Sequence, residues 1–179
     1  MFCIKELVDE DFGIESKEFN NPRIRYGARG IIINNDNIAV FNKSLKNEYK
    51  LPGGGIDEGE DPRTAFKREA MEETGCEIEI IDELGIIKEL KSNDNFMQTS
   101  YVFVAKVLKQ TNKLDLTQKE KDEGAKLLWC TPLEAYNLIS NCINNLESSA
   151  YENVYHSKFI VRRDTEILKY YLTKQGLLK

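Results

Sequence analysis

The chain has 179 residues, with 25 lysines and arginines against 30 aspartates and glutamates, so its formal net charge is −5. This length suits one domain better than two, and an apolar share of 41% is typical of a globular protein rather than of a disordered chain. The acidic balance argues against wholesale binding to nucleic acid or to an anionic membrane, since both would repel such a surface.

The first predicted elements are β-strands. Residues 29–33 and 38–41 are rich in β-branched and aromatic side chains, and the polar run 34–37 between them tolerates the geometry of a tight turn. We therefore expect a β-hairpin, followed by a short strand at 49–51.

The run 51–62 gathers glycine and proline, and the local structure must change there most abruptly. Asp61 before Pro62 is a helix-start signal, because a capping side chain precedes a proline at the first helical position. Gly75 is a helix-stop signal. Together they predict a helix over residues 62–74.

The rest of the chain predicts a mixed sheet covered by helices. Alternation and β-branching predict strands at 77–81, 84–90 and 101–107. The capping box that begins at Thr131 predicts a helix through about residue 145. Apolar residues at helical spacing predict another over about 159–172. The expected fold class is α/β.

Targeting signals and metal-binding cysteine pairs are absent from the sequence. No stretch approaches the roughly 20 apolar residues that span a bilayer, and the first ten residues lack the features of a signal peptide. We expect a cytoplasmic protein without membrane contact. The four cysteines form no CxxC pair, and one histidine is too few for a catalytic histidine pair or for most zinc enzymes.

Three glutamates of the 62–74 helix share one face. Each helical residue turns by about 100°, so Glu69, Glu72 and Glu73 lie within an arc of about 100°. Like charges so placed disfavour an isolated helix, and a divalent cation would supply the missing positive charge. Carboxylate oxygens favour Mg²⁺, with Mn²⁺ as a substitute. The alternative interpretation is an acidic face turned to solvent.

The residues around this cluster follow a longer pattern, which reads Gly54, five residues, Glu60, seven residues, Arg68-Glu69-Ala70, one residue, Glu72-Glu73, one residue, Gly75-Cys76. It resembles the Nudix box, G-x5-E-x7-R-E-U-x-E-E-x-G-U, and meets every fixed position of it. The resemblance implies a Nudix-type α/β/α sandwich with a mixed sheet. We expect a single domain over 1–179, with a core at about 22–145 and a C-terminal helical extension at about 146–179.

The resemblance also implies an activity and a site. Nudix enzymes typically cleave a nucleoside diphosphate linked to another moiety by metal-assisted attack of water on phosphorus. By position in the box, the metal-binding and catalytic roles fall to Glu69, Glu72 and Glu73, and which of them is the general base stays open. Arg68 is expected to orient a glutamate, and the Gly53 carbonyl to complete the metal shell.

A further acid in this family often precedes a strand that bears a late tryptophan. In this chain Glu120 and Glu123 precede Trp129 in that place, and we favour Glu123 as the additional metal ligand. The alternative is a charged loop in solvent.

Basic residues upstream offer partners for the phosphates. Arg23, Arg25 and Arg29 share a parity with Ile31 and Ile33, so a regular strand turns all five to one face. We expect Arg25 and Arg29 to bind substrate; the alternative is an exposed strand end. His156 and the pair 162–163 are expected on the surface.

The substrate is the least determined feature. A small-molecule nucleotide is expected, with cleavage of a nucleoside triphosphate to monophosphate and pyrophosphate as the first choice. ADP-ribose and nucleotide sugars are the alternatives, and a non-catalytic nucleotide sensor is a rival that the intact box disfavours. No nucleic-acid partner is expected. Many Nudix proteins are dimers, so a homodimer is the assembly to test.

Overall fold

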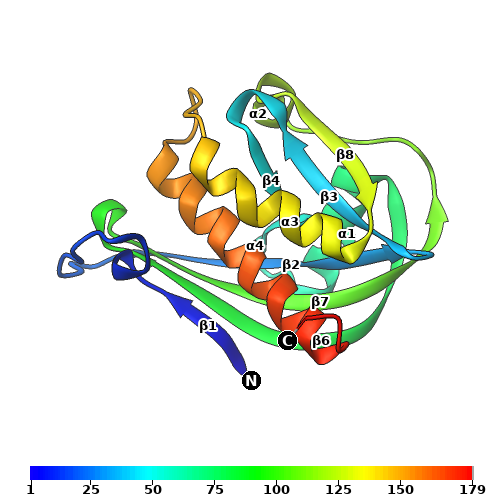
Figure 1. Cartoon of the computed structure of the whole chain (residues 1–179), viewed down its shortest axis with the longest axis horizontal. Helices are drawn as coiled ribbons and strands as arrows, with labels where there is room; N and C mark the ends of the chain where they lie inside the picture. The colour runs from blue at the N-terminus through cyan, green and yellow to red at the C-terminus, as the bar shows by residue number, and fades with distance from the viewer. Residues whose placement is uncertain (179) are drawn as a thin grey trace.

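The computed structural model describes residues 1–178 as one mixed sheet with helices on both faces (Figure 1). The strands are β1 (Cys3–Leu7), β2 (Arg23–Asn34), β3 (Asn37–Lys43), β4 (Glu48–Lys50), β5 (Gly53–Gly55), β6 (Cys76–Lys91), β7 (Phe96–Gln110) and β8 (Ala125–Cys130). The α-helices are α1 (Pro62–Thr74), α2 (Gln118–Asp122), α3 (Pro132–Cys142) and α4 (Val154–Lys174).

The sheet runs in the order β1-β6-β7-β2-β3-β4, with β5 paired to β2 and β8 paired to β3. The β1–β6 and β2–β7 pairs are parallel and the other pairs are antiparallel, which confirms the expected mixed sheet. The β2–β5 register places Gly53 opposite Arg29. A glycine segment therefore lies directly beside the strand that carries the upstream arginines.

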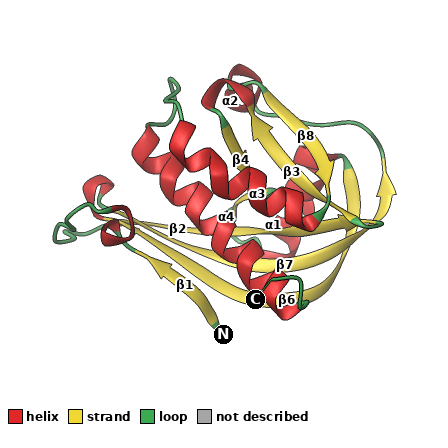
Figure 2. Ribbon diagram, viewed as in Figure 1, coloured by secondary structure: helices red, strands yellow, loops and turns green. Residues whose placement is uncertain are grey.

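Alternating residues of β2 face two separate cores. Ile31 packs into the core shared with α3 and α4, whereas Ile32 packs into the core shared with α1. Figure 2 shows α3 and α4 side by side on one face of the sheet, with α1 behind it. This arrangement confirms the α/β/α sandwich.

The predicted elements agree with the structure in type and differ in extent. The helix over 62–74 is confirmed with the predicted bounds, and the hairpin and the capping-box helix are also confirmed. The two strands expected at 77–81 and 84–90 are one continuous strand, β6. Strands β1, β5 and β8 and helix α2 were not predicted, because each is too short for a clear periodic pattern.

Helix α4 is longer than predicted and belongs to the core. It begins five residues earlier than expected, at Val154, because the side chain of Asn153 caps its first turn. Ile167 and Leu168 are fully buried in the core shared with α3. No helix within residues 1–178 combines the length and hydrophobicity needed to cross a membrane.

Candidate active site

The glutamates of α1 are positioned by signals at both ends of the helix. The Asp61 carboxylate accepts hydrogen bonds from the backbone N–H groups of Arg63 and Thr64. Gly75 ends the helix in the left-handed conformation, with φ at 64°. Between these caps the helix directs its acidic face toward the glycine segment β5.

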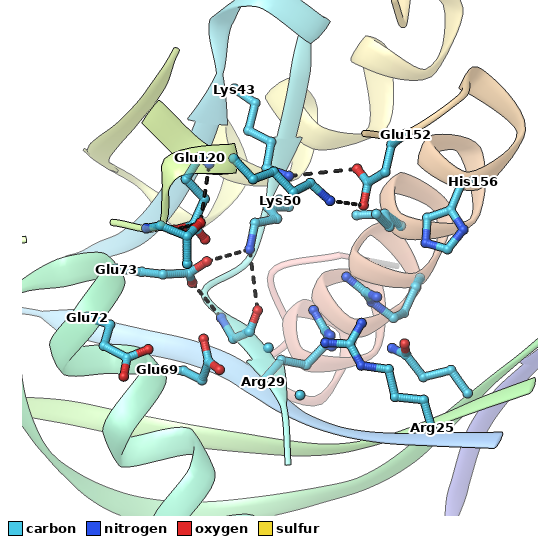
Figure 3. Close-up of a pocket in the computed structure, with 18 of the residues that line it drawn as sticks. Arg25, Arg29, Lys43, Lys50, Glu69, Glu72, Glu73, Glu120, Glu152 and His156 are labelled. Atoms are coloured by element: carbon cyan, nitrogen blue, oxygen red, sulfur yellow. Dashed lines mark hydrogen bonds and ion pairs between the residues drawn. The ribbon is translucent and has the colours of Figure 1, made fainter. Parts of the chain in front are cut away.

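This face opens onto a cavity of about 330 Å³ with walls of opposite charge (Figure 3). We call one side the acidic wall; it consists of Glu69, Glu72 and Glu73 of α1 and Glu120 of α2. We call the other side the basic wall; it consists of Arg25 and Arg29 of β2, Lys91 of β6 and Arg163 of α4.

Glu73 joins the helix to the glycine segment. Its Oε2 accepts the Gly53 N–H at 2.7 Å, and its Oε1 accepts a hydrogen bond from Lys50 Nζ at 2.6 Å. Burial raises the pKa of Glu73, although the charge of Lys50 opposes that shift. Lys50 Nζ also lies 3.3 Å from the Gly53 carbonyl oxygen. An ammonium group therefore already lies between two of the expected metal ligands.

Arg68 holds the other two glutamates of the helix. Its Nη1 donates to Glu69 at 2.9 Å and to Glu72 at 3.3 Å, while Nη2 donates to the Gly55 carbonyl oxygen at 2.9 Å. Its Nε and Nη2 donate to the two carboxylate oxygens of Glu60 at 3.0 and 2.9 Å. One guanidinium thus connects three box carboxylates to the glycine segment.

These ion pairs take up the three α1 carboxylates of the acidic wall, whereas Glu120, within the described chain, bonds only to Thr117. Among residues 1–178 no three acidic, histidine or cysteine side chains stand together as a formed metal site. The donor chemistry still fits a hard divalent cation, since the wall offers carboxylate oxygens beside a backbone carbonyl. A β-carbon at Gly54 would collide with the Glu69 carboxylate, so glycine keeps this part of the wall open.

Arg29 differs from the other buried cations of the cavity. Only 4% of it is exposed, its Nε donates to Ser100 Oγ at 3.2 Å, and no carboxylate of the described residues lies within 4.0 Å of its guanidinium. Burial and the neighbouring charge of Arg163 lower the pKa of Arg29 to about 10, so it stays protonated at neutral pH. Arg25 is exposed at the mouth of the cavity, with its guanidinium beside Gly55.

The expectation that His156 and Arg163 lie on the surface is wrong. Both line the cavity, and only 2% of Arg163 is exposed. His156 and Arg163 lie on the same face of α4 as the apolar residues Ile160 and Ile167, because the four positions are spaced i, i+4, i+7 and i+11. This helical spacing was the signal in the sequence that could have predicted their burial. Burial and the nearby Lys91 lower the pKa of His156 to about 4, so its ring is neutral.

Of the two candidate acids before Trp129, the structure places Glu120 at the cavity and Glu123 away from it. Glu123 follows the last residue of α2 and turns inward, where it pairs with Lys43 Nζ at 2.8 Å and accepts a hydrogen bond from Ser149 Oγ at 2.6 Å. It does not line the cavity, whereas Glu120 does. The signal was the capping box from Thr117, which fixes Glu120 in the first turn of α2.

Comparisons with known proteins agree with this geometry. The profile of the NUDIX domain matches residues 24–147. The RNA pyrophosphohydrolase of Pelagibacter ubique (strain HTCC1062) is 32% identical over 119 residues, which are 57% of this chain and 73% of that protein. Nudix hydrolase 25 of Arabidopsis thaliana is 46% identical over 67 residues, which are 35% of this chain and 38% of that protein.

Solved structures share the fold at low sequence identity. A NUDIX hydrolase from Nitrosomonas europaea superposes with a TM-score of 0.61 at 14% identity, over 85% of this chain and 90% of that one. A UDP-X diphosphatase superposes with a TM-score of 0.54 at 20% identity, over 95% of this chain and 72% of that one. With the complete box and the profile match over most of its length, the chain belongs to the Nudix hydrolase family.

Proposed function

We propose that this chain hydrolyses a phosphoric anhydride bond in a nucleoside diphosphate linked to another moiety, and that it needs a divalent cation to do so. A nucleoside triphosphate, cleaved to monophosphate and pyrophosphate, is the substrate to test first. The observation that carries the proposal is one cavity in which four glutamates face a buried arginine without a carboxylate partner. A diphosphate would bind the arginine directly and the glutamates through a cation.

The cation would be held by Glu69, Glu72, Glu73 and the Gly53 carbonyl, with Glu120 beside them. Carboxylate and carbonyl oxygens are ligands for Mg²⁺ or Mn²⁺. When bound, such an ion neutralises phosphate charge and lowers the pKa of a bound water. Lys50 Nζ lies between Glu73 and the Gly53 carbonyl, so a positive charge already occupies the space between these two oxygen ligands.

The chain's own side chains then have separate tasks. Arg29 and Arg25 bind and orient the phosphates, because their guanidinium groups match phosphate oxygens in pairs. Arg68 fixes the orientation of Glu69 and Glu72. A carboxylate of the acidic wall accepts the proton of the attacking water.

A second candidate substrate is the 5′-triphosphate end of RNA. The RNA pyrophosphohydrolase of Pelagibacter ubique aligns with this chain over 73% of its own length, which is why RNA is considered. An RNA 5′ end would present the same phosphates to the cavity, but the net charge of −5 disfavours the remaining polyanion.

The test is a substrate panel with Mg²⁺, with Mn²⁺ and with a chelator. The panel holds nucleoside triphosphates, ADP-ribose, nucleotide sugars, dinucleoside polyphosphates and a 5′-triphosphorylated RNA. We expect metal-dependent cleavage of at least one of them, with release of pyrophosphate or phosphate from a triphosphate, or of two phosphorylated fragments from ADP-ribose, a nucleotide sugar or a dinucleoside polyphosphate. Tight nucleotide binding without any hydrolysis would instead identify a non-catalytic sensor.

A further inference from the structure

Glu89 is a fully buried carboxylate behind the basic wall, and a cation lies beside each of its oxygens. Its Oε1 lies 3.0 Å from Lys91 Nζ. Its Oε2 accepts hydrogen bonds from Arg163 Nη1 and from Gln98 Nε2, each at 3.1 Å. Burial alone would raise the pKa of Glu89, but the charges of Lys91, Arg163 and Arg29 lower it far below the usual value, so the group is ionised.

The remaining donors of Arg163 bind a second buried carboxylate. Its Nε and Nη2 donate to Asp164 Oδ1 at 2.7 Å and Oδ2 at 3.2 Å. Asp164 Oδ2 also accepts the N–H of Leu51 at 2.9 Å, two residues before the glycine segment. Each of the three guanidinium nitrogens of Arg163 therefore donates to a buried carboxylate.

Arg29 is hydrogen-bonded to the same cluster, but none of the cluster's carboxylates pairs with its guanidinium. Ser100 Oγ accepts hydrogen bonds from Arg29 Nε at 3.2 Å and from Gln98 Nε2 at 3.1 Å, and that amide nitrogen also donates to Glu89. A short hydrogen-bonded relay thus joins Arg29 to Glu89. The cluster has three cations, including Arg29, and two carboxylates, and the surplus positive charge belongs to Arg29.

We infer that Arg163 is a positioning residue that occupies Glu89 and thereby keeps the guanidinium of Arg29 available for substrate phosphates. Without Arg163, Glu89 would lose one of its two paired cations, and Arg29, which the relay already joins to Glu89, is the nearby cation without a carboxylate partner. The inference rests on the proposed function. It also assigns a role at the cavity to α4, which lies beyond the residues that match the family profile.

The experiment measures binding of inorganic pyrophosphate in the presence of Mg²⁺ to the full chain by calorimetry. Arg163→Met should weaken binding roughly 10- to 100-fold, because Arg29 would turn from the anion to Glu89. The double variant Glu89→Gln with Arg163→Met should return to within about threefold of the wild type, because it removes the carboxylate that the relay joins to Arg29, whereas Asp164 Oδ2 stays bound to the Leu51 N–H. A general loss of structure would not be rescued by a second substitution in the same cluster.

Arg162→Met is the matched control. Arg162 is the adjacent arginine of α4, it is partly exposed and it pairs with Glu166, so pyrophosphate affinity should not change. Circular dichroism of each variant checks folding. Turnover of the folded single variant should show a raised KM with little change in kcat.

Each outcome either supports or overturns the inference about Arg163. Unchanged affinity in folded Arg163→Met overturns the inference and leaves the proposed function standing. Equal weakening in the single and double variants also overturns it, because Arg163 would then act on the anion without Glu89. If Arg163→Met does not fold, the double variant decides. Pyrophosphate affinity of the double variant close to that of the wild type supports the inference, and weaker binding overturns it. Failure of the wild type to bind pyrophosphate overturns the inference, whereas the proposed function stands or falls on the substrate panel.

Discussion

The two walls of the cavity are built in opposite ways. Three of the four members of the acidic wall come from one helix of 13 residues, whose caps lie within the same short segment. The basic wall is assembled from β2, β6 and α4, between residues 25 and 163. A local motif fixes the first wall, whereas the second exists only after the chain has folded.

The walls also differ in how their charge is compensated. Arg68 and Lys50 pair with the three α1 carboxylates of the acidic wall from within the cavity, at the place where a metal ion would bind. Glu89 and Asp164 neutralise the basic wall from behind and leave Arg29 unmatched. Substitutions in the two walls should therefore change different kinetic constants.

The largest expected effect is that of Glu73→Gln in the acidic wall. The change removes a ligand charge but keeps the size of the side chain and an acceptor for the Gly53 N–H. We expect kcat to fall about 100-fold or more, with the fold intact. Steady-state kinetics with a nucleoside triphosphate and Mg²⁺ test it, with thermal unfolding as the control. A rate close to that of the wild type would remove Glu73 from the catalytic group.

In the basic wall, Arg29→Met should act mainly on KM. Loss of a buried charged donor to phosphate should raise KM roughly 10- to 100-fold and leave Mg²⁺ affinity unchanged. The free energy of unfolding should not fall, because the variant removes a buried charge that has no carboxylate partner.

The matched control for Arg29 is Arg23→Met. Arg23 lies on the same strand, but it covers the ring of Phe96 at 4.5 Å and lines the adjoining pocket instead of this cavity. Equal effects of the two substitutions would mean that general positive charge, and not Arg29 itself, attracts the substrate.

The same contrast explains what the sequence could predict. The acidic wall was found in full at its helix, because caps and glutamates lie within fifteen residues of one another and their spacing alone places them on one face. Arg25 and Arg29 were found because strand parity is also a local rule.

The missed residues depend on contacts between distant segments. One of the two carboxylates that hold Arg163 in the interior is Glu89, 74 residues earlier in the chain. A lone arginine in a helix pattern is read as exposed unless the partner is known. Glu123 is the opposite case, a residue expected at the site that lies elsewhere. Its position shortly before Trp129 in the sequence did not show that it pairs with Lys43 in the interior.

A third prediction, with an expected effect of intermediate size, compares substitutions of Glu120 and Glu123. Glu120→Gln should weaken Mg²⁺ binding by several-fold, because it removes one carboxylate from the acidic wall. Glu123→Gln should leave Mg²⁺ binding unchanged but lower the free energy of unfolding by about 1 to 3 kcal/mol, since it leaves Lys43 less well paired. Calorimetric titration and denaturant unfolding of both variants separate the two effects, and the reverse assignment would restore Glu123 as the metal ligand.

The smallest expected effect concerns the start of α1. Asp61→Ala removes the acceptor for the N–H groups of Arg63 and Thr64 and should lower Tm by about 2 to 4 °C. Asp61→Asn keeps a capping oxygen and should lower it less. Neither should change kcat, because Glu73 holds the helix to Gly53 at the far end from the cap. A fall in kcat for the alanine variant alone would contradict this prediction. It would show that the positions of the acidic-wall glutamates depend on the Asp61 cap as well as on the bond between Glu73 and Gly53.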